Sequence, residues 1–302
     1  MSEHIDNIFD KNIELHITYV INYNKEAENI MKNWDKGEKI MNKVKDILKN
    51  YYSEYDEDGR LEKDNAHRME FIATTKYIEK YLKPEDRMIE IGAATGRYSL
   101  YFAKKGFKVD SVELLEENLN ILKNKIEPGM KINTMQANAM DLSMYKDNSF
   151  NITLCLGPLY HLFSNEDKLK AISEAIRITK PGGKIFLAYI TNDSVILNYG
   201  LKKGNLKRLA KMCDENFKVP DIPEEIFSVS YIKDFNKLMM KFKNIKKIKE
   251  VGIDGIAPTI GAPYINNLSE EEFNIWVKYH LANCEREDIM GYSSHILYIA
   301  EK

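Results

Sequence analysis

The feature that most constrains the fold is a regular alternation of short apolar segments and amphipathic helical segments between Arg87 and Ile190. The apolar segments read MIEI, KVDSVEL, MKINTMQA, FNITLCLG and KIFLAYI. Strands that alternate with helices in this way form a parallel sheet joined by crossover helices. The alternation therefore predicts an α/β fold with its β-α units in chain order.

Other segments flank this core. Residues 1–82 have helical patterns, and we expect an N-terminal helical extension or lid. A lysine-rich helical segment over residues 193–243 interrupts the alternation, and we interpret it as an insertion that caps the substrate. The alternation then resumes with NIKKIKEVGIDGI, a helix opened by the capping box of Ser269 and Glu272, and the strand SHILYIAEK. These patterns predict one sheet domain over residues 83–302.

The composition argues against several classes of protein. The 302 residues include 44 basic and 46 acidic side chains. This balance argues against a dedicated nucleic-acid-binding protein. Cys155, Cys213 and Cys284 occur singly, without the paired spacing of a zinc site or a disulfide framework, so we expect no metal. The N-terminus is too polar for a signal peptide, and no long apolar stretch is uninterrupted. We expect a cytoplasmic protein without a membrane segment, and its oligomeric state stays open.

The turn Glu90-Ile91-Gly92-Ala93-Ala94-Thr95-Gly96 follows the first apolar strand. Its small residues permit a sharp turn into a helix and leave the backbone open to a nucleotide-like ligand. A dinucleotide fingerprint needs small residues at its first, third and sixth positions, but the sixth here is Arg97. No Gly-Lys-Ser/Thr follows the turn, so a Walker phosphate loop is also disfavoured.

The segment MIEIGAATGRYSLYFAKKGFKVDSVEL resembles motif I and its continuation in class I S-adenosylmethionine (SAM)-dependent methyltransferases. The resemblance extends from about Arg87 to Ile190. It implies a Rossmann-like fold with a seven-stranded, mostly parallel sheet of order 3-2-1-4-5-7-6, whose last strand is antiparallel. It also implies SAM as cofactor, with S-adenosylhomocysteine as product, and residues 83–302 as the catalytic domain.

The resemblance places the methionine part of the cofactor against the backbone of the turn. Ala94 stands where the family has its middle glycine, and we expect its methyl group to narrow the loop slightly. The turn residues that the resemblance assigns to the cofactor are Glu90, Gly92, Ala93 and Gly96.

Two later strand ends complete the expected cofactor site. Glu113 ends the second strand, twenty-one residues after Gly92, and its carboxylate can accept hydrogen bonds from a ribose diol, with Leu114 beside it. The alternative is a solvated glutamate at a helix start. Asn138 and Ala139 match the family segment that meets adenine, although an Asx turn that closes the strand is the alternative.

The segment Leu156-Gly157-Pro158-Leu159-Tyr160-His161-Leu162 follows the fourth strand, where open α/β sheets bind their ligands. It resembles an LGPLYHL variant of motif IV found in small-molecule methyltransferases, and it implies that Leu156 contacts the cofactor. His161 has a suitable intrinsic pKa for a general base, and Tyr160 could orient the acceptor. A helix-capping or backbone-bonding role for His161 is equally open.

The segment before the first strand could close over the cofactor. We expect Tyr55 to contact the sulfonium by cation–π attraction and Arg68 to pair with the cofactor carboxylate. Packing of the lid against the body is the alternative.

These patterns together favour transfer of the SAM methyl group to an O, N or S nucleophile of a small molecule by in-line displacement. An RNA methyltransferase is one alternative, because lysines cluster in the insertion and near residue 245. A SAM-binding sensor without turnover is another. A nicotinamide oxidoreductase would require binding of NAD in place of SAM.

Overall fold

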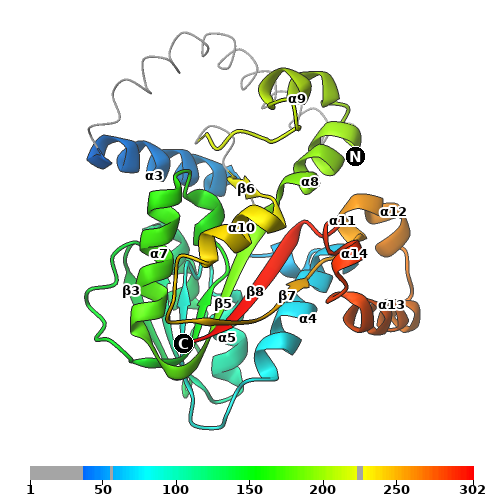
Figure 1. Ribbon diagram of the computed structural model, residues 1–302. Helices are drawn as coiled ribbons and strands as arrows, with labels where there is room; N and C mark the ends of the chain where they lie inside the picture. The colour runs from blue at the N-terminus through cyan, green and yellow to red at the C-terminus, as the bar shows by residue number, and fades with distance from the viewer. Residues whose placement is uncertain (1–36, 55–56, 223–226) are drawn as a thin grey trace. The chain divides into compact units, whose positions relative to one another are not determined.

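The computed structural model describes residues 37–54, 57–222 and 227–302 (Figure 1). The chain divides into two compact units, Met1–Asp46 and Ile47–Lys302. Helix α3 (Gly37–Glu54) begins in the first unit, and every element named below lies in the second. This division differs from the expected boundary after residue 82, because helix α4 (Asn65–Glu79) packs into the core of the sheet unit.

One sheet organises the second unit. Its strands are β1 (Arg87–Ile91), β2 (Lys108–Glu113), β3 (Ile132–Gln136), β4 (Phe150–Cys155), β5 (Thr179–Thr191), β6 (Val229–Ser230), β7 (Lys246–Gly252) and β8 (His295–Glu301). The order is β3-β2-β1-β4-β5-β8-β7, and β6 pairs with β5 outside this path. Strands β1 to β5 are parallel to one another, whereas β8 is antiparallel to β5 and β7.

The expected Rossmann-like fold is confirmed. The expected order 3-2-1-4-5-7-6 corresponds to the observed one, because the short β6 raises the numbers of the last two strands by one. Because β1, β2, β4 and β5 run in the same direction, their carboxyl ends meet at one edge of the sheet, which we call the carboxyl edge. The first residue of β8 lies at the same edge, opposite Ile190 of β5.

Helices cover both faces of the sheet. Figure 1 shows α7 (Asn165–Ile178) and α10 (Ile232–Met239) on one side and α4 and α5 (Arg97–Lys104) on the other. The remaining helical segments are η1 (Arg60–Glu62), α6 (Glu116–Asn124), η2 (Pro158–His161), α8 (Asn192–Ser194), η3 (Val195–Leu201), α9 (Leu206–Met212), α11 (Ala257–Ile260), α12 (Ala262–Ile265), α13 (Glu270–Asn283) and α14 (Glu287–Met290). The capping box expected at Ser269 and Glu272 is present at the start of α13.

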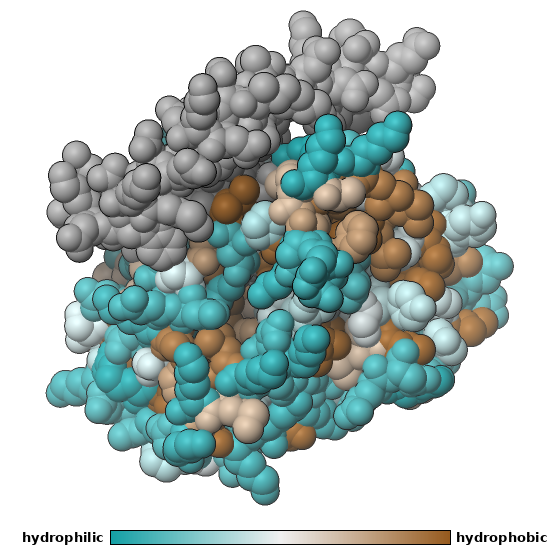
Figure 2. All heavy atoms as spheres, turned by 45° about the horizontal axis from the view of Figure 1, so that its top comes forward, coloured by the Kyte–Doolittle hydropathy of each residue, from teal (hydrophilic) through white to brown (hydrophobic). Residues whose placement is uncertain are grey.

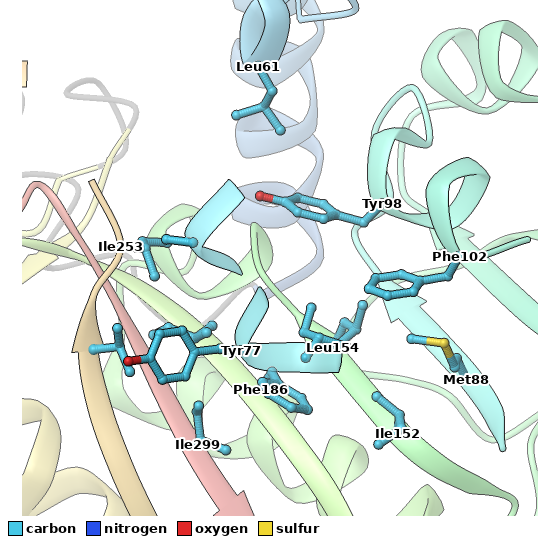
Figure 3. Close-up of a cluster of buried hydrophobic side chains, with 14 of the residues drawn as sticks. Leu61, Tyr77, Met88, Tyr98, Phe102, Ile152, Leu154, Phe186, Ile253 and Ile299 are labelled. Carbon is cyan, nitrogen blue, oxygen red and sulfur yellow. The ribbon is translucent and has the colours of Figure 1, made fainter. Parts of the chain in front are cut away.

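The main hydrophobic core lies between the sheet and helices α4 and α5 (Figure 3). Tyr77 and Ile78 of α4 meet Phe102 of α5 and Phe186 of β5, and all four side chains are fully buried. Burial of such side chains is the dominant favourable term in folding. Because α4 contributes large side chains to this core, it belongs structurally to the sheet unit and not to a separate lid.

Within the segment over residues 193–243, the described part contains α8, η3, α9 and α10, a non-helical stretch over residues 213–222, and the strand β6. Val229 was expected in a helix, but its pairing with Ile190 places it in the sheet, where its side chain is buried. Tertiary pairing overrides local helical preference here. On the face drawn in Figure 2, hydrophilic side chains predominate and hydrophobic ones appear between them. Within the described part of the chain, no helix is long and apolar enough to cross a membrane.

Candidate functional site

The turn between β1 and α5 is sterically tight. Gly92, Ala94 and Gly96 have φ values of 74°, 46° and 86°, in the left-handed region that favours glycine. A Cβ atom on Gly92 would lie 2.6 Å from the Pro158 ring, and one on Gly96 would overlap the Leu122 side chain. The turn therefore needs glycine at both positions, and Pro158 of η2 is in close contact with it.

The two alanines of the turn have different environments. The Ala93 amide donates to the Val112 carbonyl at 2.9 Å, and its buried side chain packs against Leu119 and Leu122. Ala94 adopts the left-handed conformation, which costs a non-glycine residue about 1–2 kcal/mol. Alanine in place of the family's middle glycine therefore adds conformational strain to the backbone at position 94. This strain comes in addition to the narrowing of the loop by the methyl group, which the sequence suggested.

Glu90 places a carboxylate beneath the turn with little access to water. Its side chain is buried, and Oε2 accepts hydrogen bonds from the Ser99 amide at 2.8 Å and the Ser99 hydroxyl at 2.5 Å. Burial raises the pKa of Glu90 to about 8, the Ser99 hydrogen bonds oppose this rise, and the nearby Glu113 charge adds to it. No lysine or arginine of the described residues contributes to this pKa.

Glu113 joins the turn to the end of β2. Its Oε2 accepts a hydrogen bond from the Ala94 amide at 2.8 Å, and its Oε1 accepts one from the Leu115 amide at 2.9 Å. Burial raises the pKa of this carboxyl, and the backbone hydrogen bonds oppose that rise. The Leu114 amide and the Asn118 side chain also act on this carboxylate as hydrogen-bond donors. Glu113 is thus a buried structural residue and not the solvated glutamate of the alternative interpretation.

The loop after β3 contains the Asx turn of the alternative interpretation. Asn138 Oδ1 accepts a hydrogen bond from the Met140 amide at 2.9 Å, and the Asn138 carbonyl accepts one from Asp141. The side chains of Ala139 and Leu114 are partly exposed. Asn138 therefore holds the loop in shape, and contact of this loop with adenine stays a prediction.

The segment after β4 lies among aromatic side chains. His161 Nε2 is 2.9 Å from the Tyr52 hydroxyl, so at least one imidazole nitrogen is engaged by α3. The rings of Tyr160 and His161 are 5.0 Å apart, and both approach Phe227, at 5.9 and 5.4 Å between ring centroids. Leu156 is partly buried against the main core. The expected acceptor residues are thus brought together, with Tyr52 as an additional partner.

Arg68 has a different set of partners from those expected. Its guanidinium donates to Glu270 at 2.9 and 3.1 Å and to Asn65 at 2.7 Å, and it lies 4.6 Å from the centre of the Phe273 ring. These contacts join α4 to α13, which agrees with the alternative that this segment packs against the body of the protein. The structure gives no support to pairing of Arg68 with a cofactor carboxylate. Tyr55 lies outside the described residues.

A buried ion pair near Tyr160 was not expected from the sequence. Arg60 donates to both oxygens of Glu70, at 2.7 and 3.3 Å, and to Glu57 at 3.2 Å. Burial opposes the charge on Glu70, but Arg60 and His295 lower the pKa of that carboxyl to about 2. Arg60 lies in a polar connector with no periodic pattern, so no local signal could have singled it out.

The chemistry of the turn fits SAM. The Glu90 carboxylate, buried without a compensating cation in the described part of the chain, suits the ammonium group of the methionine part. The Glu113 carboxylate at the end of β2 is an acceptor of the kind that a ribose diol needs. Among the described residues, no group of three or more His, Cys, Asp or Glu side chains is placed to hold a metal ion.

Comparisons with solved structures show the fold. A SAM-dependent methyltransferase from Thermotoga maritima covers 86% of this chain and 99% of its own with a TM-score of 0.52 and 20% identity. Similarity at this level shows the fold, and the fold is that of class I SAM-dependent methyltransferases.

Sequence comparisons are consistent with this class. Residues 88–183 match the family model described as a methyltransferase domain. YqeM of Bacillus subtilis, whose name describes a methyltransferase, is 27% identical over 109 residues, which are 36% of this chain and 44% of YqeM. The ubiquinone biosynthesis O-methyltransferase of Hydrogenovibrio crunogenus is 27% identical over 163 residues, 54% of this chain and 64% of that protein. The matches thus span less than two thirds of these relatives.

Residues 88–183 thus match a methyltransferase domain, and the fold and the relatives support a SAM-dependent methyltransferase with SAM as cofactor. The matched segment, residues 88–183, contains the turn, Glu113, the loop after β3 and the aromatic segment after β4.

Proposed function

We propose that this protein transfers the methyl group of SAM to an O, N or S nucleophile of a small molecule by in-line displacement. The observation that carries the proposal is the turn Glu90–Gly96, whose left-handed backbone and buried Glu90 carboxylate fit SAM, together with the buried Glu113 carboxylate at the end of β2. The similarity to an O-methyltransferase of ubiquinone biosynthesis supports a small-molecule acceptor.

Each part of the cofactor has proposed partners. The turn would hold the methionine part of SAM, and Glu113 with Leu114 would hold the ribose. The loop at Asn138 and Ala139 would contact the adenine. Leu156 would lie between the cofactor and the acceptor. The methionine part would contact Glu90, Gly92, Ala93 and Gly96. When bound, SAM supplies an electrophilic methyl group on a sulfonium.

The protein would position the acceptor and exclude water. Tyr160 and His161 lie beside Pro158, which touches the turn at Gly92. Their rings, with Phe227 and Tyr52, form an aromatic wall that can hold an acceptor in line with the departing sulfur. His161 is one candidate for the general base of the reaction.

The test is calorimetric titration of the full chain with SAM, S-adenosylhomocysteine and NAD, followed by a screen for S-adenosylhomocysteine release with amines, phenols, alcohols and thiols. We expect binding of SAM and its product, no binding of NAD, and turnover with at least one acceptor. Absence of SAM binding would contradict the proposal. Tight SAM binding with no turnover would favour a sensor, and turnover only with added RNA would favour the RNA alternative.

A further inference from the structure

A histidine and an aspartate from distant parts of the chain form a close pair at the carboxyl edge. His295 Nδ1 lies 2.8 Å from Asp254 Oδ2, and the His295 amide donates to Asp254 Oδ1 at 3.1 Å. The Ser293 hydroxyl also donates to Asp254, whose side chain is buried. The Ser293 hydroxyl and the His295 amide thus fix the carboxylate, and a carboxylate partner at Nδ1 favours the imidazole tautomer with the proton on Nδ1.

The other imidazole nitrogen, Nε2, points away from the Asp254 contact at Nδ1. Within the described part of the chain, His295 Nε2 makes no hydrogen bond, and 20% of the side chain is exposed. The arrangement is that of a base whose orientation is set by a carboxylate. His161 differs, because its Nε2 is engaged by the Tyr52 hydroxyl.

The pair borders the acceptor side of the proposed site. The His295 ring centroid lies 6.2 Å from that of Tyr160, which belongs to the same short helix as Pro158. Pro158 in turn is packed against Gly92 of the turn. The segment Leu156–Leu162, which was expected to meet the acceptor, therefore lies between His295 and the turn that is proposed to hold the cofactor.

We propose that His295 is the general base of the methyl transfer and that Asp254 orients it. This inference rests on the proposed function and limits the acceptor class, because a base is required only when the attacking atom carries a proton. The acceptor is therefore a hydroxyl or an amine, and not a thiolate or a tertiary amine. In the reaction, the proton of the acceptor passes to His295 Nε2, and the acceptor's electron pair forms the bond to the methyl carbon. The carbon–sulfur bond breaks, and its electron pair stays on sulfur.

Several charged groups act on the imidazole. Burial lowers the pKa of His295, but Glu70 of α4 and Asp254 outweigh burial and raise it above 6.5, while Arg60 of η1 acts in the lowering direction. Glu70 Oε2 is 3.8 Å from Nδ1. Glu57, beside Arg60, and the Tyr160 ring also face this region. Because the base must be unprotonated, turnover should rise with pH through the pKa of His295.

The first test needs no acceptor. Two-dimensional NMR of the histidine side chains in the full chain reports the tautomer and the pKa of His295. We expect the Nδ1-protonated tautomer and a pKa above 6.5 that falls in Asp254→Asn, because the lost carboxylate no longer stabilises the imidazolium. The Nε2-protonated tautomer, or a pKa unchanged by Asp254→Asn, would overturn the inference.

The second test uses the acceptor found in the screen. His295→Gln should lower kcat about 10²- to 10⁴-fold, the usual contribution of general-base catalysis, while the Kd for SAM stays within about twofold. Asp254→Asn should move the acidic limb of the pH profile to lower pH. His67→Gln is the matched control, because His67 Nδ1 also pairs with an aspartate, Asp64, at 2.7 Å, and it should keep wild-type kcat.

The variants distinguish this inference from the proposed function. If His295→Gln keeps wild-type kcat across the pH range, or if His161→Gln alone abolishes turnover, His295 is not the base although the protein is a methyltransferase. If the wild type binds SAM but methylates nothing, the proposed function fails. The NMR measurement then decides by itself whether His295 has the Nδ1-protonated tautomer and the raised pKa that its pairing with Asp254 predicts. If His295→Gln does not fold, Asp254→Asn and the NMR titration still decide.

Discussion

Replacement of Glu90 by glutamine should have opposite effects on stability and on cofactor binding. The side chain is 3% exposed, and burial raises the pKa of its carboxyl from 4.5 to about 8. A folded-state pKa above the unfolded value means that the folded chain binds this proton more tightly. The contribution of Glu90 to stability is therefore fully present below about pH 4.5 and is lost as the pH rises toward 8.

The size of this loss follows from the difference between the two pKa values. A difference from 4.5 to about 8 corresponds to an upper value of about 5 kcal/mol, and a realistic range is about 3 to 5 kcal/mol. Glutamine cannot ionise, but its carbonyl oxygen can still accept the two hydrogen bonds from Ser99. It should weaken SAM binding by about 1.5–3 kcal/mol, or about 10- to 150-fold in Kd, since the cofactor ammonium loses a charged partner.

The assay is urea unfolding of the cofactor-free chain at a series of pH values for wild type and Glu90→Gln, followed by calorimetric titration with SAM. The stability of the variant relative to wild type should rise between about pH 5 and pH 8 by the amount given above. Glu116→Gln, an exposed change at the start of α6, is the control and should leave both quantities unchanged. A stability difference that does not change with pH, or an unaltered Kd for SAM, would refute the reasoning.

Other substitutions at the turn have distinct expected outcomes. Glu113→Ala should raise the Kd for SAM about 10- to 150-fold by calorimetry and should lower the unfolding free energy by about 1–3 kcal/mol, because the Ala94 and Leu115 amides lose their acceptor; an unchanged Kd would rule out the ribose assignment. Gly96→Ala should cost about 3 kcal/mol or more of stability in urea unfolding, since φ is 86° and the new methyl would overlap Leu122; wild-type stability would contradict the geometry. Ala94→Gly should change stability by less than about 1 kcal/mol, because relief of the left-handed strain offsets the added freedom of the unfolded chain, and SAM affinity should be retained.

The sheet could be predicted from the sequence because its signals are local. Each strand from β1 to β5 is a short apolar run, and each crossover helix has its own apolar face, so order and direction follow from general rules of chain connection. The capping box at Ser269 is likewise contained in four consecutive residues. Glu113 could be proposed from the sequence because it stands at the end of a strand, where open α/β sheets bind ligands.

The remaining features depend on contacts between distant residues. Asp254 and His295 are 41 residues apart and meet only because β7 and β8 are antiparallel neighbours. Arg68 was expected to meet the cofactor, but Glu270 on α13 offers a bidentate partner that no local pattern shows. The packing of α4 into the main core has the same origin, since the apolar face of a helix does not reveal which surface it covers.

The central claim is that the turn from Glu90 to Gly96 and the carboxylate of Glu113 bind SAM. A crystal structure of the full chain with S-adenosylhomocysteine tests it most directly. We predict the methionine part against the turn and both ribose hydroxyls within hydrogen-bonding distance of Glu113. A ligand bound elsewhere, or a ribose that makes no contact with Glu113, would contradict the claim.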